Sequence, residues 1–522
     1  MEKQAKALDF EQPARTKLVK GVVTLAKAVK STLGARGRTV LIESNAHVGG
    51  MTITKDGITV AKEVRLSDPV EDLAVRVVMQ AAARTALEAG DGTTSAIVIA
   101  ESLVVNGFKL ITPELNRIEV LRHMQTITEG VVKQLKSSAV SVRGRRLSDV
   151  AIISANNDTK VGKVIASAFK AVGKDGSVIV SKAMGAETYA DISSGVRLDR
   201  GYISPYLVTD HGADAWTGQN VRVLLSTQTI DQVMSIEKAI KPLVKEAKPI
   251  LFISPLTNNM TNVIVANAVK NGIPLCAIEP PSFGYKQEEL MGDLALALGG
   301  KTFSERTGDM LEQITLDDLG TAAKVTVGRS STTIVIEQSE ETKAACRERI
   351  EQLLKSQPTK RSDKEFIAER ISILNGTVAV VYVGGNTEIE QKELFDRVDD
   401  AICAVESALQ EGVVCGAGKA LAQIEIPVSP NAEYMVARAI MEQALCAPYN
   451  QIIDNAGGIP MVFGKGRGYN VKTMEEVDLI KEGIIDPVKV VRCALQNAVS
   501  VAVTILSTNA VITHQQNHAS DK

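Results

Sequence analysis

The segment Gly90-Asp91-Gly92-Thr93-Thr94 combines flexible glycines, a carboxylate and two hydroxyls between two apolar helical stretches. Glycines let the backbone turn tightly and approach a ligand closely. The first turn of the following helix offers unpaired N–H groups and the positive end of the helix dipole, which favour phosphate. Asp91 would repel phosphate unless a cation lay between them, so we predict that it binds magnesium. For this segment alone, an ordinary glycine-rich turn with a helix cap is the alternative.

Two other glycine-containing segments carry weaker signals. Thr32–Arg38 follows a helical stretch, and Gly412–Gly418 forms a third flexible stretch. The latter runs into Lys419 and so resembles the end of a P-loop. That motif requires an earlier glycine and a Ser or Thr after the lysine, but these places hold Val413 and Ala420. We also expect a helix, and no strand, before this segment, and we therefore exclude a P-loop.

Acidic side chains beside these loops could supply the second requirement of a reaction at phosphate. Asp56 lies in the turn Lys55-Asp56-Gly57, and Asp399-Asp400 is expected to open a helix just upstream of Gly412. A carboxylate near the terminal phosphate can orient or activate the attacking water. Taken alone, either acid could instead belong to a solvated turn or cap a helix.

The elements expected to hold these loops fall into three parts along the chain. The first 140 residues and the last third show helical spacing of apolar residues, most strongly at Leu73–Ala89 and Pro487–Leu506. Between about residues 193 and 331, short β-branched runs alternate with helical segments, which is an α/β pattern. Because the two ends share one composition, they could form a single domain with the middle inserted.

Composition narrows the class of protein. The chain has 522 residues, enough for about three domains. Its net charge is −2, which does not indicate a nucleic-acid partner. The six cysteines form no C-x-x-C pair, so neither a zinc site nor a disulfide framework is expected. No secretory signal and no uninterrupted apolar run of about 18 residues occurs, so we expect a cytoplasmic protein without a membrane span.

Together these segments resemble the group I chaperonins, the bacterial and organellar GroEL type. The matches follow the family's order over nearly the whole chain. They are Thr32–Gly34 with Gly37-Arg38, Thr52–Gly57, Gly90–Thr94, Ile153–Asn156, Asp199–Tyr206, Thr315–Gly320, Glu411–Val414, Tyr469-Asn470, Gly483–Pro487 and Lys489-Val490.

The resemblance implies a multidomain α+β chaperonin fold. Residues 1–140 and 412–522 would form a mainly helical equatorial ATPase domain, and residues 141–193 and 379–411 a small α/β intermediate hinge domain. Residues 194–378 would form an inserted α/β apical domain that binds substrate. The resemblance further implies ATP hydrolysis, a homo-oligomeric seven-membered ring, one ring or two, unfolded polypeptides as clients and a co-chaperonin lid.

The resemblance also assigns roles at the nucleotide site. Asp91 would hold magnesium, whereas Thr32, Lys55 and Thr94 would help to hold potassium. Asp400 would act on the attacking water, and Asp56 would support it. The residues expected to bind ATP are Thr32, Leu33, Gly34, Lys55, Asp91, Gly92, Thr93, Thr94, Ser95, Ile153, Gly416, Tyr469, Asn470, Ile484 and Asp486.

The expected client groove departs from the family pattern. Glu237 and Thr261 stand where apolar residues are usual. The side chains that fall on matching apolar positions could also be ordinary core residues. They are Tyr202, Tyr206, Leu207, Ile240, Ile264 and Val265.

Other departures indicate a divergent member of the family, from a specialised paralogue or a virus. Ala417 interrupts the usual glycines, a change that its small side chain should allow. Asn450 and Ile459 occupy places where the family often has an Arg and a Glu that pair between rings, so ring stacking stays open. A non-cycling holding scaffold with weak ATPase activity and specialised clients is the alternative to a folding machine.

Overall fold

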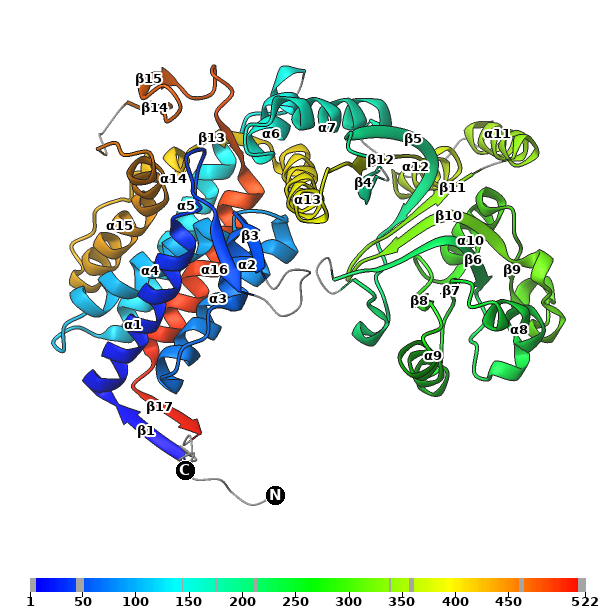
Figure 1. The fold of residues 1–522 in the computed structure, drawn as a ribbon, viewed down its shortest axis with the longest axis horizontal. Helices are drawn as coiled ribbons and strands as arrows, with labels where there is room; N and C mark the ends of the chain where they lie inside the picture. The colour runs from blue at the N-terminus through cyan, green and yellow to red at the C-terminus, as the bar shows by residue number, and fades with distance from the viewer. Residues whose placement is uncertain are drawn as a thin grey trace. The chain divides into compact units, whose positions relative to one another are not determined.

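The computed structural model describes residues 6–43, 51–142, 144–173, 177–183, 185–210, 214–337, 339–355, 361–459 and 464–514. The chain divides into two compact units, drawn in Figure 1. The first comprises Met1–Ala166, Lys182–Tyr189 and Val383–Lys522, and the second Ser167–Ser181 and Ala190–Tyr382. The second unit is thus inserted into the first. The further separation of an intermediate domain stays a prediction.

Long apolar helices form the core of the first unit and run side by side in Figure 1. They are α1 (Glu11–Lys30), α3 (Pro69–Ala89), α4 (Thr93–Leu110), α5 (Arg117–Ser137), α15 (Ala432–Asn455) and α16 (Val488–Ser507). Helix α16 packs against α3, α4 and α5. Within the described part of the chain, α16 alone is long and apolar enough to cross a membrane, but most of it is buried in this core.

The start of α3 shows how local sequence sets an element's bounds. Asp68 caps the helix by accepting hydrogen bonds from the N–H groups of Val70 and Glu71, and Pro69 occupies the first turn. The helix ends at Gly90, whose φ of 73° lies in the left-handed region. The turn that carries Asp91 is therefore fixed at the end of a buried helix.

The two ends of the chain meet in the first unit. Strand β1 (Lys6–Phe10) pairs antiparallel with β17 (Ala510–His514), with Leu8 opposite Ile512. Both ends of the chain therefore belong to one compact unit. Smaller elements complete the unit: β2 (Val40–Glu43), β3 (Met51–Thr54), α2 (Gly57–Glu63), α6 (Arg145–Ser154), α13 (Glu388–Glu411), β13 (Val413–Cys415), α14 (Lys419–Ala422), β14 (Arg467–Asn470), β15 (Glu475–Asp478) and β16 (Ile485–Pro487). Helix α7 (Thr159–Val172) leads from the first unit into the second.

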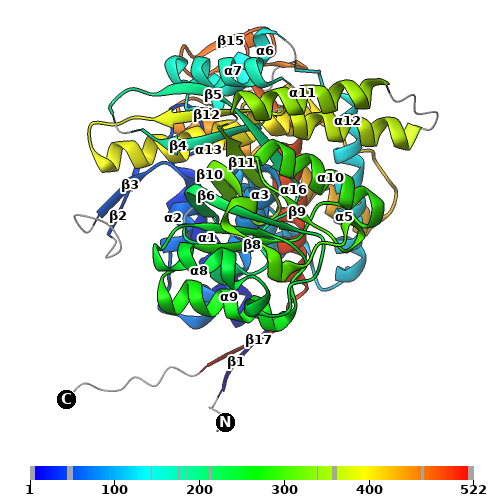
Figure 2. The same ribbon diagram turned by 90° about the vertical axis from the view of Figure 1, so that its right-hand side faces the viewer.

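The second unit is built on a mixed sheet of nine strands in the order β4-β12-β5-β11-β10-β6-β7-β8, with β9 beside β6. The strands are β4 (Ser177–Lys182), β5 (Tyr189–Leu198), β6 (Trp216–Ser226), β7 (Ile250–Ile253), β8 (Leu275–Ile278), β9 (Thr302–Phe303), β10 (Gly320–Val327), β11 (Thr332–Ile336) and β12 (Thr377–Val383). Its helices are α8 (Glu237–Lys245), α9 (Asn258–Asn271), α10 (Gly284–Leu298), α11 (Glu340–Lys355) and α12 (Arg361–Asn375). Helices α11 and α12 lie side by side in Figure 2 and pack with α10. The α/β pattern predicted for the middle of the chain is confirmed.

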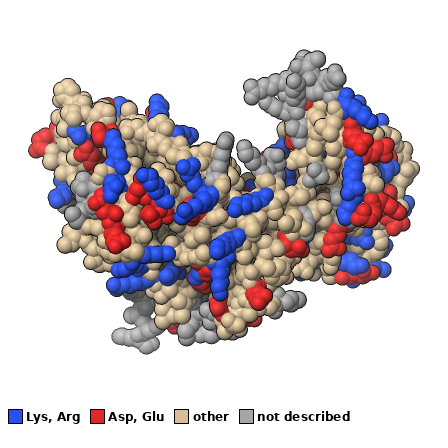
Figure 3. Space-filling view, turned by 90° about the horizontal axis from the view of Figure 1, so that it is seen from above, with Lys and Arg blue, Asp and Glu red and all other residues tan. Residues whose placement is uncertain are grey.

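Both signs of charge occur together on the protein surface. On the face shown in Figure 3, Lys and Arg side chains lie among Asp and Glu side chains across much of the view. Positive and negative side chains are therefore interspersed on this face.

Two expected elements differ in the structure. Asp399-Asp400 does not open a helix: α13 begins at Glu388, where Thr387 caps it by accepting a hydrogen bond from the Glu390 N–H. Asp400 therefore lies in mid-helix. Strand β13 precedes the Gly416–Gly418 segment, where no strand was expected, because it pairs with the distant strand β16.

Candidate functional site

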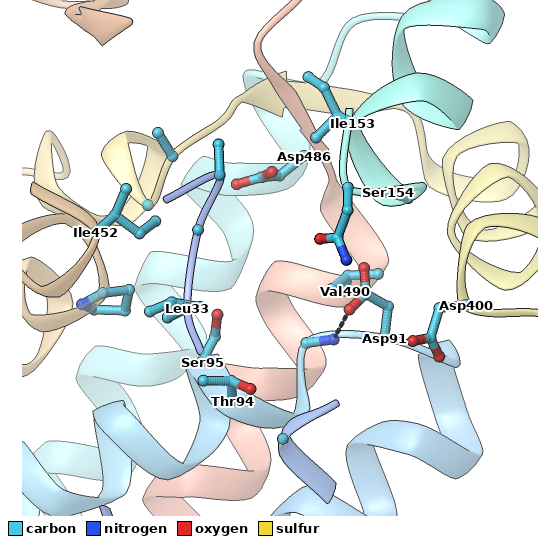
Figure 4. Close-up of a pocket in the computed structure, with 18 of the residues that line it drawn as sticks. Leu33, Asp91, Thr94, Ser95, Ile153, Ser154, Asp400, Ile452, Asp486 and Val490 are labelled. Atoms are coloured by element: carbon cyan, nitrogen blue, oxygen red, sulfur yellow. Dashed lines mark hydrogen bonds between the residues drawn. The ribbon is translucent and has the colours of Figure 1, made fainter. Parts of the chain in front are cut away.

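A cavity of about 460 Å³ in the first unit collects nearly all the residues predicted to act on nucleotide. Cavities of this size are typical of small-molecule sites. The predicted residues that line it are Thr32, Leu33, Gly34, Lys55, Asp91, Gly92, Thr93, Thr94, Ser95, Ile153, Tyr469, Asn470, Ile484 and Asp486, together with Asp56 and Asp400. Segments that are far apart in the sequence thus meet around one space (Figure 4).

Gly416 is the predicted binding residue that does not line this cavity. Its N–H donates to the Ile484 carbonyl at 2.9 Å. The backbone of Gly416 therefore supports Ile484, which lines the cavity. The next two residues, Ala417 and Gly418, line the cavity instead. Ala417 has a φ of 56°, in the left-handed region. The sequence predicts that alanine is allowed at position 417 because its side chain is small. The left-handed backbone conformation nevertheless costs free energy for any residue that has a Cβ.

The N-terminus of α4 faces the cavity with backbone N–H groups that have no partner within the helix. Gly92, with a φ of 86°, precedes the helix and offers no side chain to cap it. The first bond inside the helix runs from the Ala96 N–H to the Gly92 carbonyl at 3.0 Å. The N–H groups of Thr93, Thr94 and Ser95 therefore have no partner within the helix, and they lie where an anion would gain most from the helix dipole.

Three carboxyl groups at the cavity have raised pKa values. Enclosure by protein and then the charge of Asp91 raise the pKa of Asp400 well above its ordinary value. Enclosure also raises the pKa of Asp91, opposed by the hydrogen bond that its Oδ1 accepts from the Gly92 N–H at 2.5 Å. Enclosure and the charge of Asp91 raise the pKa of Asp486 to about 7. Figure 4 shows Asp91 and Asp400 at the same end of the site.

These carboxylates offer oxygen donors, but in the part of the chain that the structure describes no three acidic, His or Cys side chains come together to hold a metal ion by themselves. Within the described residues, none of Asp91, Asp400 and Asp486 forms an ion pair. Magnesium prefers oxygen ligands and is often held by one or two carboxylates together with substrate phosphates. The residues present therefore fit a divalent cation between Asp91 and a phosphate group, where it would offset the mutual repulsion of the carboxylates.

Asp56 has a structural role as well as a place in the cavity wall. Its Oδ2 accepts hydrogen bonds from the Thr59 N–H at 2.9 Å and the Thr59 hydroxyl at 2.6 Å, and its Oδ1 accepts one from the Ile58 N–H at 3.2 Å. It is thus the N-cap of α2, which was the alternative interpretation of this acid. The adjacent Gly57 brings the backbone against the Thr94 hydroxyl, because a Cβ there would come within 2.0 Å of that oxygen.

Several residues that line the cavity were not predicted from the sequence as site residues. Glu393 and Asp396 lie seven and four residues before Asp400 on α13, so helical spacing could have indicated that they share its face. Asn156 and Asn157 also line the cavity, and both adopt left-handed backbone conformations. An Asn-Asn pair after a helical stretch is a signal for that conformation. Pro448 and Ile452 of α15 carried no comparable signal.

The residues expected to bind clients lie in the second unit and differ in exposure. Tyr206 is 74% exposed. Tyr202 is half-buried and donates its hydroxyl to Asp214 at 3.1 Å. Val265 is also half-buried. The aliphatic residues Leu207, Ile240 and Ile264 are buried in the core of this unit, so in this structure their side chains pack inside the protein.

Comparison with known proteins finds a family match and structural matches that cover most of the chain. The model of the TCP-1/cpn60 chaperonin family matches residues 25–279 and 253–516. Among solved structures, the chain is similar to the chaperonin gp146 from the bacteriophage EL 2 (Pseudomonas aeruginosa), crystallised in the presence of ATP-BeFx. In one crystal form the TM-score is 0.68 at 21% identity, covering 98% of this chain and 99% of gp146. In another the TM-score is 0.61 at 20% identity, with the same coverage.

Proposed function

The chain belongs to the TCP-1/cpn60 chaperonin family and has its multidomain α+β fold, and from this premise we propose that it is an ATP-dependent folding chaperone. ATP would bind and be hydrolysed in the cavity of the first unit, and the second unit would capture non-native polypeptides. The observation that carries the proposal is the meeting of Asp91, Asp400 and the open N-terminus of α4 in one cavity.

Each part of the nucleotide has a candidate partner in this cavity. The phosphates would accept hydrogen bonds from the N–H groups at the start of α4, whose residues Thr93, Thr94 and Ser95 also bring hydroxyls. Tyr469, Asn470 and Ile484 would contact the base and ribose. Magnesium held by Asp91 would neutralise phosphate charge, and potassium would bind near Thr32, Lys55 and Thr94.

Hydrolysis would depend on Asp400. Its carboxylate lines the cavity on the same face of α13 as Asp396, where it can accept a hydrogen bond from a water molecule and orient that water toward the terminal phosphate. The pKa of this carboxyl is raised in the protein alone, so bound cations would favour the ionised form that accepts the proton. Asp56 would support the cluster through its charge while it caps α2.

Client capture would use the second unit in a seven-membered ring of identical subunits, with a co-chaperonin lid as a further partner. Tyr206 is the exposed aromatic residue among the predicted contacts. The burial of Leu207, Ile240 and Ile264 leaves fewer apolar contacts than expected. This observation favours keeping the second candidate function, a scaffold that holds specialised clients with weak ATPase activity.

Refolding of a denatured client with and without ATP separates these two functions. A folding machine should raise the yield of active client when ATP is added, and an Asp400→Ala variant should not. If ATP gives no gain while the protein still prevents client aggregation, the folding proposal is wrong and the holding scaffold is favoured.

A further inference from the structure

We infer that Asn455 is a positioning residue for nucleotide binding, an inference that rests on the proposed function. Asn455 does not line the cavity. It is the last residue of α15, and it contacts the segment after α1 that forms one cavity wall. Its role would be to hold Thr32, Leu33 and Gly34 in the conformation that accepts ATP.

The contact consists of two short hydrogen bonds from one side-chain amide. The Nδ2 group of Asn455 donates to the Lys30 carbonyl and to the Leu33 carbonyl, both at 2.8 Å. The Lys30 carbonyl also accepts a longer hydrogen bond from the Leu33 N–H at 3.3 Å, so the amide adds a shorter bond there and links the end of α1 to the first turn beyond it. Both N–H hydrogens of the amide are used.

A second side chain fixes the direction of this amide. The Nε2 group of Gln451, one turn earlier on α15, donates to Oδ1 of Asn455 at 2.9 Å. Oδ1 is thereby kept toward Gln451, and Nδ2 is kept toward the two carbonyls. The side chains of Gln451 and Asn455 thus connect α15 to the backbone of the cavity wall through successive hydrogen bonds.

The held segment is conformationally demanding. Gly34 has a φ of 86°, and a Cβ at this position would come within 3.0 Å of the Ile452 side chain. A Cβ at Gly37 would come within 2.0 Å of the Thr32 carbonyl oxygen. Two glycines cost conformational entropy when ordered, so this wall requires outside contacts to stay in place.

Arg36 forms a second, weaker connection between the segment after α1 and the residues beyond α15. It donates to the Ala456 carbonyl at 3.2 Å and to the Lys472 carbonyl at 2.9 Å, but it is exposed. Leu33 and Ile452 lie on the same side of the cavity in Figure 4. The end of α15 therefore sets the position of the Thr32–Gly34 wall relative to the opposite wall at Asp91.

The test uses Asn455→Asp, which keeps the shape of the side chain and replaces its two donors with an acceptor. The carboxylate would face the Lys30 and Leu33 carbonyls and repel them. We expect the KM for ATP to rise about tenfold or more, since each lost hydrogen bond is worth roughly a factor of two to ten. The kcat should stay within about threefold, because Asp91 and Asp400 are not touched. Gln451→Leu should shift KM in the same direction by a smaller factor.

The matched control is Asn431→Asp, the same chemical change at the other end of α15. Asn431 caps this helix by accepting a hydrogen bond from the Tyr434 N–H at 2.7 Å, and Asp caps as well as Asn. This variant should keep the wild-type KM. A KM of Asn455→Asp equal to that of wild type would overturn the inference.

Hydrogen exchange without nucleotide separates this inference from the proposed function. Amides between Leu33 and Arg38 should exchange faster in Asn455→Asp than in wild type or Asn431→Asp. Unchanged exchange overturns the inference whatever the ATP kinetics show. If wild type neither binds nor hydrolyses ATP, the proposed function fails, and the inferred role in nucleotide binding fails with it even where exchange is faster.

Discussion

Cys403 of α13 fills the space that a side chain at Gly90 would need. A Cβ built on Gly90 would lie 2.1 Å from Cys403 Cβ and 2.7 Å from its Sγ. One turn further along α13, the Ser407 hydroxyl donates to the Ala89 carbonyl at 3.1 Å. Asp400 lies three residues before Cys403, on the same side of the helix. The packing of α13 against the end of α3 thus sets how far Asp400 reaches into the cavity.

Gly90→Ala should reduce ATP turnover by moving α13. The new methyl group clashes with Cys403, and alanine at a φ of 73° carries about 1–2 kcal/mol of strain. We expect kcat to fall about tenfold or more, measured as steady-state phosphate release, while ATP binding falls less. Adding Cys403→Gly should recover part of kcat, because it removes the clash and leaves the backbone strain. An unchanged kcat in Gly90→Ala would show that this contact does not position Asp400.

Ala417→Gly should not destabilise the protein. Ala417 adopts a left-handed conformation that glycine reaches without strain, and the relief of about 1 kcal/mol exceeds or matches the added entropy of the unfolded chain. The melting temperature should therefore stay equal or rise. Ala420→Gly in α14 is the control and should lower it, since glycine weakens helices. A clear fall for Ala417→Gly would contradict the strain argument.

Asp486 should make the nucleotide-free protein less stable as pH rises. Its pKa is raised to about 7 from an ordinary value of 3.8, so the folded chain holds this proton more tightly than the unfolded chain. The stabilisation is full below about pH 4 and is lost as pH rises through 7, by at most about 4 kcal/mol. Between pH 5 and pH 8, the melting temperature of wild type should fall more than that of Asp486→Asn.

The control for this pH dependence is Asp478→Asn. Its hydrogen bond with Lys481 lowers the pKa of the Asp478 carboxyl, the opposite direction. This variant should keep the wild-type loss of stability between pH 5 and pH 8. Parallel melting curves for wild type and Asp486→Asn would contradict the assignment of the effect to Asp486.

Ring pairing should be weak or dependent on nucleotide. Asn450 and Ile459 stand where the family often has a charged pair between rings, and both are exposed here. Native mass measurement of wild type should show single rings or a shift in ring number when ATP is added. The double variant Asn450→Arg with Ile459→Glu should favour paired rings. A stable fourteen-subunit wild-type particle under all conditions would refute the prediction.

Much of the candidate site was accessible from sequence because its residues lie in short segments with local signals. Gly90 and Gly92 indicated a turn, and the apolar stretches on both sides indicated the helices that fix it. Strands β7 (Ile250–Ile253) and β8 (Leu275–Ile278) lie in the stretch where short β-branched runs were predicted to alternate with helices, because such runs between helices are typical of buried strands.

The rest depends on tertiary contacts that no local pattern carries. A helix was expected to open at Asp399, eleven residues after the observed start of α13 at Glu388. The apolar residues from Val398 onward give a stronger signal than the charged first turns, whose start is defined by the cap at Thr387. Strand β13 forms through pairing with the distant residues Pro487, Asp486 and Ile485, and its Val413 also pairs with Val140. Burial of Ile240 and Ile264 likewise follows from packing under the sheet of the second unit, which spacing alone could not distinguish from a groove.

The most direct test of the central claim compares phosphate release by wild type, Asp400→Ala and Asp399→Ala. Asp399 is the matched control because it precedes Asp400 on α13 and does not line the cavity. We predict that wild type hydrolyses ATP, that Asp400→Ala loses about 100-fold or more of kcat while still binding ATP, and that Asp399→Ala stays within about threefold of wild type. Asp400→Ala turning over ATP as fast as wild type would contradict the account.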